Sequence, residues 1–195
     1  MKNIYLKNSF SLSLVNCQVF LILGLLMMGC DSKSQFGEVK GYVSREDDRW
    51  EDMKIKVCFE QDGYQVDKAN IEKNVKSELA KAGIELFGWS KCSAEEDGLR
   101  VYLSDAPGSR VLDFGRRNDG LPNAIQLGLG HDCPVDYSGS ECQANIALHE
   151  FGHAIGLHHE MNRRDNPGCN FEQTGGQGED GAVQIGDFDQ QSIMN

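Results

Sequence analysis

The sequence predicts an α+β fold, and three stretches of the chain predict it. Residues 53–60 and 98–104 alternate polar and apolar side chains, which is the period of a half-buried β-strand. Residues 67–82 instead place an apolar side chain at every fourth position, which forms one stripe along a helix. Strands and helices of this kind can cover one another's apolar faces.

Shorter signals mark the other elements. Asp67 precedes the apolar stripe as a candidate N-cap, and Gly83 follows it as a residue that can end a helix. In the first half of the chain we further expect a turn at 62–63 and a strand at 84–89. Short strands are expected at 111–114 and 124–127, with a turn at 117–120 between them. A second long helix from 140 or 141 to 155 and a surface loop over 165–186 follow.

The first 30 residues have the character of an export signal. Lys2 and Lys7 supply positive charge, and residues 19–28 form an apolar stretch that is too short to span a bilayer comfortably. Residues 27–30 resemble a bacterial lipobox, in which Cys30 is lipidated and becomes the mature N-terminus. An ordinary signal peptide with an incidental cysteine is the alternative.

We therefore expect a lipoprotein-type signal peptide over 1–29, a tether or short pro-segment over 30–52, and one folded domain over 53–195. The net charge of −11 disfavours nucleic acid and anionic membrane surfaces as partners. We expect membrane contact only through the lipid on Cys30. The protein is expected to be exported and held at a bacterial envelope, or otherwise to be periplasmic or secreted.

The seven cysteines suggest disulfides rather than a metal site. Export implies an oxidising compartment, where cysteines pair. Cys133 and Cys142 flank a loop rich in Pro, Gly and Ser, which suggests a local bridge. Cys58 and Cys92 lie at the ends of neighbouring expected strands and suggest a second bridge. Cys169 is left over, and no pair among these five shows the C-x₂-C spacing of a metal site.

Residues 149–159 carry the pattern H-E-x-x-H-x-x-G-x-x-H, which predicts a zinc site. His149 and His153 are four residues apart, so a helix places them one turn apart on one face. Gly156 lets the chain leave the helix, because glycine tolerates positive φ, and the turn returns His159 as a third ligand. Three protein ligands leave a fourth position for water, as in a catalytic zinc site.

Glu150 follows the first ligand and is the expected general base. Zinc lowers the pKa of a bound water molecule from about 15.7 to roughly 7. Glu150 can take the proton of this water and pass it to the leaving amine, so a peptide bond is hydrolysed without a covalent intermediate. We expect the neighbouring His158 to be exposed or to support the ligands, and motif spacing gives no role to His131.

With this pattern the chain resembles the metzincin metalloproteases. Glu160 follows the third histidine as in the astacin-like branch, and residues 160–165 resemble the segment that follows there. Residues 192–195 resemble the Met-turn, with Met194 as a support beneath the zinc that does not ligate it. A looser similarity to bacterial secreted relatives of that branch extends towards residue 54.

The resemblance implies a twisted, mostly parallel sheet, a long zinc-binding helix, and a cleft between an upper and a lower subdomain. It also implies an edge strand at 124–128 that pairs with substrate, although an ordinary hairpin explains these residues equally well. In such enzymes Glu160 is tied to the mature N-terminus, and a local ion pair with Arg163 or Arg164 is the alternative here. Relatives continue beyond the Met-turn, so we expect a truncated chain with an incomplete C-terminal subdomain.

The function expected from the sequence is that of a metalloendopeptidase with one catalytic zinc ion, acting on a protein or peptide substrate. Two alternatives remain open. One is a catalytically inactive zinc-binding surface lipoprotein, against which the intact Glu150 argues. The other is a zinc peptidase that acts on cell-wall peptides.

Overall fold

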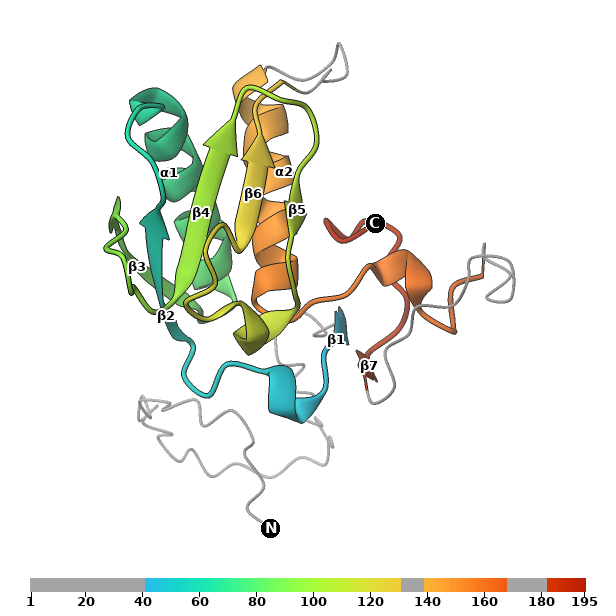
Figure 1. Ribbon diagram of the computed structural model, residues 1–195. Helices are drawn as coiled ribbons and strands as arrows, with labels where there is room; N and C mark the ends of the chain where they lie inside the picture. The colour runs from blue at the N-terminus through green and yellow to red at the C-terminus, as the bar shows by residue number, and fades with distance from the viewer. Residues whose placement is uncertain (1–40, 131–138, 168–181) are drawn as a thin grey trace, which may run out of the picture. The chain divides into compact units, whose positions relative to one another are not determined.

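The computed structural model describes residues 41–130, 139–167 and 182–195. Its main sheet has five strands in the order β3-β2-β4-β6-β5 (Figure 1). These are β2 (Lys54–Phe59), β3 (Glu85–Lys91), β4 (Leu99–Ser104), β5 (Arg110–Val111) and β6 (Ile125–Gly128). All neighbouring pairs are parallel except β5 and β6, which are antiparallel. The expected α+β class and mostly parallel sheet are confirmed.

Two long helices, α1 (Gln65–Lys81) and α2 (Gly139–Ala154), lie side by side against one face of this sheet (Figure 1). The hydrophobic core lies between the two helices and the sheet. It contains the apolar stripe of α1 that the sequence predicted, together with the inward side chains of the central strands. On α2 the inward residues are Ala147, Phe151 and Ala154. This packing fixes α2 so that its other face is free to carry a site.

A bulge in β3 helps to seat α2. The pairing of β3 with β2 shifts register between Val57 and Cys58, and Trp89 is the extra residue there, with φ of 59°. The Trp89 ring stacks on Phe151 of α2, with 5.6 Å between ring centroids. Neither helix, nor any other within the described ranges, combines the length and apolar character that a membrane crossing requires.

A second, two-stranded sheet joins distant parts of the chain. Strands β1 (Gly41–Val43) and β7 (Val183–Ile185) pair in antiparallel fashion. Short 3₁₀ turns occur at η1 (Glu46–Asp48), η2 (Gly115–Asn118) and η3 (Glu160–Asn162). Residues 41–48, which we expected in the tether, therefore belong to the folded part, and the expected loop over 165–186 contains a strand.

Three local predictions differ from the structure. Strand β6 is not the edge of the sheet, because β5 pairs along its outer side. The expected strand over 111–114 is strand only at Val111, as part of β5, and α1 begins before Asp67, with Tyr64 at its N-cap position. The expected turn at 117–120 is present, as the end of η2 and a turn at 119–120. The order of strands depends on long-range pairing, which alternation along a single strand does not report.

Candidate metal centre

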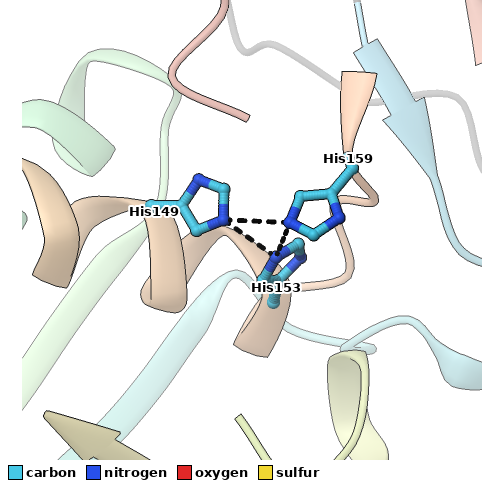
Figure 2. Close-up of side chains that lie close together, drawn as sticks. All are labelled: His149, His153 and His159. Atoms are coloured by element: carbon cyan, nitrogen blue, oxygen red, sulfur yellow. Dashed lines mark hydrogen bonds between the residues drawn. The ribbon is translucent and has the colours of Figure 1, made fainter. Parts of the chain in front are cut away.

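Three histidines from two segments converge on one point. His149 and His153 lie one turn apart on α2, and His159 stands at the N-cap position of η3. The chain leaves α2 through Gly156, which has φ of 106°, as the sequence predicted. The three Nε2 atoms are 3.1, 3.1 and 3.2 Å from one another (Figure 2).

This cluster fits a zinc ion. At Zn–N distances of about 2.0–2.1 Å, tetrahedral ligands place their nitrogens about 3.3 Å apart. The observed separations come close to that value, and within the described residues these three side chains form the group of possible ligands. One ion could therefore contact all three nitrogens with little movement of the chain.

Hydrogen bonds orient two of the rings for this role. Nδ1 of His149 lies 2.7 Å from the Ile193 carbonyl oxygen, and Nδ1 of His153 lies 2.7 Å from the Leu157 carbonyl oxygen. A carbonyl only accepts, so each Nδ1 carries the proton and each Nε2 presents a lone pair to the centre.

Burial favours the neutral form of two of the rings. It lowers the pKa of His153 to about 4, and it also lowers the pKa of His159. A neutral imidazole is the form that ligates a metal, so the low pKa values favour metal binding at neutral pH.

Glu150 lies beside this cluster in a cavity of 440 Å³, which is also lined by all three histidines. An adjoining cavity of 410 Å³ is lined by Glu150 and His149 together with Ile146 and Ile193. Burial raises the pKa of Glu150 to about 7. A carboxylate in this range is suited to exchange protons at neutral pH.

Met194 and Gly152 meet beside the three histidines. Met194 is buried, and a Cβ atom on Gly152 would lie only 2.5 Å from its Sδ atom. The sequence pattern predicted a role for Met194 but none for Gly152. The signal was a glycine inside an expected helix, which costs about 1 kcal/mol relative to alanine and often marks close packing.

His158 is buried and supports the wall of the site. Its Nε2 atom lies 3.0 Å from Oγ of Ser44, and its ring stacks on Phe114 at 4.3 Å between centroids. The Phe114 ring also meets His153 edge-on. The sequence left the place of His158 open and gave no signal for Ser44 or Phe114, because these contacts join distant segments.

Glu160 pairs with Arg163, one of the alternatives that the sequence left open. Both side chains are almost completely buried.

Strand β5 forms one rim of the larger cavity, which residues 109–114 line. The Leu112 N–H donates to the Ala124 carbonyl, so the alternation of an antiparallel pair directs the N–H and C=O of Val111 away from β6. Strand β5 is thus the edge strand of the sheet, and its residues line the cavity.

Cys58 and Cys92 form a disulfide, with Cα atoms 5.0 Å apart. Cys142 is also disulfide-bonded. Its expected partner Cys133 lies outside the described residues, as do Cys30, Cys169 and His131.

Comparison with known proteins gives a consistent result. The family model described as Astacin, a family of peptidases, matches residues 42–168. One structure of myroilysin has 18% sequence identity and a TM-score of 0.55, and the match covers 79% of this chain and 82% of that one. This likeness supports the fold.

Two further structures match about half of their own length. A crystal structure of myroilysin has 20% identity over 58% of this chain and 48% of that one, with a TM-score of 0.44. High choriolytic enzyme 1, a hatching enzyme zinc-protease from the medaka fish Oryzias latipes, has 20% identity over 60% of this chain and 52% of that one, with a TM-score of 0.41. No curated protein matches the chain.

Proposed function

The chain belongs to the astacin family of peptidases, and we propose that it is a zinc-dependent endopeptidase in which Glu150 is the general base. The observation that carries this proposal is the convergence of three Nε2 atoms, within 3.2 Å of one another, beside a buried carboxylate. His149, His153 and His159 are the proposed ligands.

The residues of the chain divide the work of hydrolysis. Zinc, when bound, polarises a substrate carbonyl and makes a water molecule more acidic. The Glu150 carboxylate accepts the proton of the attacking water, and its acid form then delivers the proton to the leaving amine nitrogen. The raised pKa of Glu150 supports both steps, because the group can hold and release a proton near neutral pH.

Strand β5 is the proposed docking edge for substrate. The outward N–H and C=O of Val111 can pair with the main chain of an extended peptide, which would add a strand beside the cavity. Main-chain pairing of this kind requires a peptide or an unfolded protein segment, so these are the proposed substrates.

Export and anchoring remain part of the proposal on sequence grounds. We assign 1–29 as a signal peptide and Cys30 as the lipidated residue, with catalysis on the exported side of the membrane. Met194 is proposed as the residue that supports the ligands from below, in keeping with its contact with Gly152.

Proteolysis of an unfolded protein such as casein tests the function. Zinc-loaded wild-type protein is expected to cleave it, and Glu150→Gln to lose activity by a factor of about 10² to 10⁴. Glu78→Gln, an exposed change on α1, is the matched control and should keep full activity. Zinc binding without cleavage by any variant would overturn the endopeptidase and favour an inactive zinc-binding protein. Cleavage of cell-wall peptides but not of casein would change the substrate class.

A further inference from the structure

Arg163 is a buried cation four residues beyond His159. Its side chain is 0% exposed. A buried guanidinium is tolerated only when its donors are satisfied, so its partners show what the residue holds together.

Part of the guanidinium binds the small sheet. Nη1 donates to the carbonyl oxygens of Gly41, at 2.9 Å, and Ile185, at 3.1 Å, while Nη2 donates to that of Gly186. Gly41 begins β1 and Ile185 ends β7, and Gly186 directly follows β7. One side chain therefore fastens both strands to the segment that follows the third ligand.

The same guanidinium binds two carboxylates. Nε and Nη2 reach the two oxygens of Asp165, at 2.9 and 2.7 Å, and Nε also lies 3.3 Å from Oε1 of Glu160. This fork is planar and uses several donors at fixed angles, which a lysine ammonium cannot reproduce.

Glu160 continues the contacts towards the ligands. Its Oε1 accepts the Asp189 N–H at 3.1 Å, and its own N–H donates to the Met194 carbonyl at 2.9 Å. The turn at 189–194 is thereby held in place. This turn presents the Ile193 carbonyl to Nδ1 of His149.

We propose that Arg163 is a positioning residue of the metal centre, which sets the places of His159 and of the 189–194 turn relative to α2. His159 directly precedes Glu160, and His149 is oriented through Ile193, so two of the three ligands depend on contacts that Arg163 organises. The inference rests on the zinc site of the proposed function, but not on peptidase activity.

Zinc affinity separates this role from a general contribution to stability. We expect full-length Arg163→Lys, in its folded form, to bind zinc about tenfold or more weakly than wild type in competition with a chromophoric chelator. The absorption spectrum of the Co²⁺-loaded protein should change as well, because the ligand geometry is altered. Arg164→Lys is the matched control, since Arg164 is exposed, and it should bind zinc as wild type does.

Folded Arg163→Lys with the zinc affinity and cobalt spectrum of wild type would overturn the proposal, even if its melting temperature were lower. Should that variant not fold, Asp165→Asn takes its place, because it weakens the fork while keeping the shape of the side chain. Its zinc affinity is expected to fall as well, and an unchanged affinity would again overturn the proposal.

Proteolytic activity is measured separately from zinc binding. If wild type binds zinc but cleaves nothing, the endopeptidase fails while the zinc measurements still decide the role of Arg163. If wild type binds no zinc, both proposals fail.

Discussion

Gly152 and Met194 lie closer together than a side chain at position 152 would permit. Helix propensity alone predicts that Gly152→Ala stabilises α2 by about 1 kcal/mol. A Cβ atom would instead meet Sδ of Met194 at 2.5 Å and Cε at 3.2 Å, and Met194 is buried. Because the methionine must move within a packed region, we expect a net loss of about 1–3 kcal/mol.

The free energies of unfolding in urea of four proteins measure the interaction between Gly152 and Met194. The set is wild type, Gly152→Ala, Met194→Ala and the double variant. The double variant should be more stable than the sum of the single changes implies, since removing the methionine makes room for the alanine. Additivity within about 0.5 kcal/mol would show that the two residues do not interact.

At the scale of residues, spacing along the chain identified the candidate ligands, the general base and Met194, but not the contacts that join distant segments around them. His149, Glu150 and His153 occupy one helix, so a pattern of a few residues defines their geometry. The contact of Ser44 with His158, and those of Arg163 with β1 and β7, join segments far apart in sequence. No local period reports such contacts, and they appear only when the chain is folded.

At the scale of elements, strand β5 offers a test of how substrate binds. Val111→Pro removes an N–H that points away from β6, and Arg110 before it is already extended, so the change is compatible with the strand. The loss of about one main-chain hydrogen bond to substrate should reduce kcat/KM for peptides about fivefold to tenfold.

Leu112→Pro is the contrasting variant. Its N–H donates to the Ala124 carbonyl within the sheet, so this change should lower the stability of the protein itself. If Val111→Pro left kcat/KM unchanged, substrate would not pair with β5 through this N–H.

The elements that the sequence predicted best are those with a local period. Helices α1 and α2 and strands β2 and β4 all lie within a few residues of their expected positions. Strands β1 and β7 have three residues each and pair across most of the chain, so neither carries enough alternation to be recognised. The edge position of β5 was missed for the same reason, because a two-residue strand is defined by its partner.

At the scale of the whole molecule, one ion pair between neighbouring strands of the sheet should make the stability of the protein depend on pH. Glu60 at the end of β2 binds Arg100 of β4 through both oxygens and accepts the Asn123 N–H. Its hydrogen bonds with Arg100 are the main cause that lowers the pKa of Glu60 below its usual value. A lowered carboxyl pKa stabilises the fold above the ordinary pKa, and the contribution is lost as pH falls through the lowered value.

Replacement of Glu60 by Gln should remove this part of the pH dependence. We expect the variant to lose about 3 kcal/mol at pH 7, because Arg100 is left buried without its anion. Wild type should lose its advantage as the pH falls below about 4.5, towards and through the lowered pKa of Glu60. Chemical unfolding at a series of pH values measures the difference, and a gap that stayed constant down to pH 2 would contradict the role of the charge.

Zinc is expected to stabilise the whole protein through the segments that its ligands join. An ion that binds only the folded state at a hundred times its Kd adds about 2.7 kcal/mol, which corresponds to roughly 5–10 °C in Tm for a chain of this size. A strong chelator should therefore lower Tm by this amount, and His153→Ala should show no zinc-dependent shift. A chelator-insensitive Tm would mean that the three histidines hold no ion tightly.

The loss of stability on zinc removal should differ from one part of the chain to another. The amides of Leu157, Glu160 and Arg163 flank His159 and donate to the carbonyl oxygens of Gly152, Met194 and Glu160. Their hydrogen exchange should accelerate when zinc is removed. Amides of β2 and β4 lie in the core of the sheet, away from the ligands, and should keep their relative protection. Equal acceleration in both regions would mean that zinc stabilises the fold globally. Acceleration confined to the first would mean that the metal completes a segment which the core alone does not hold.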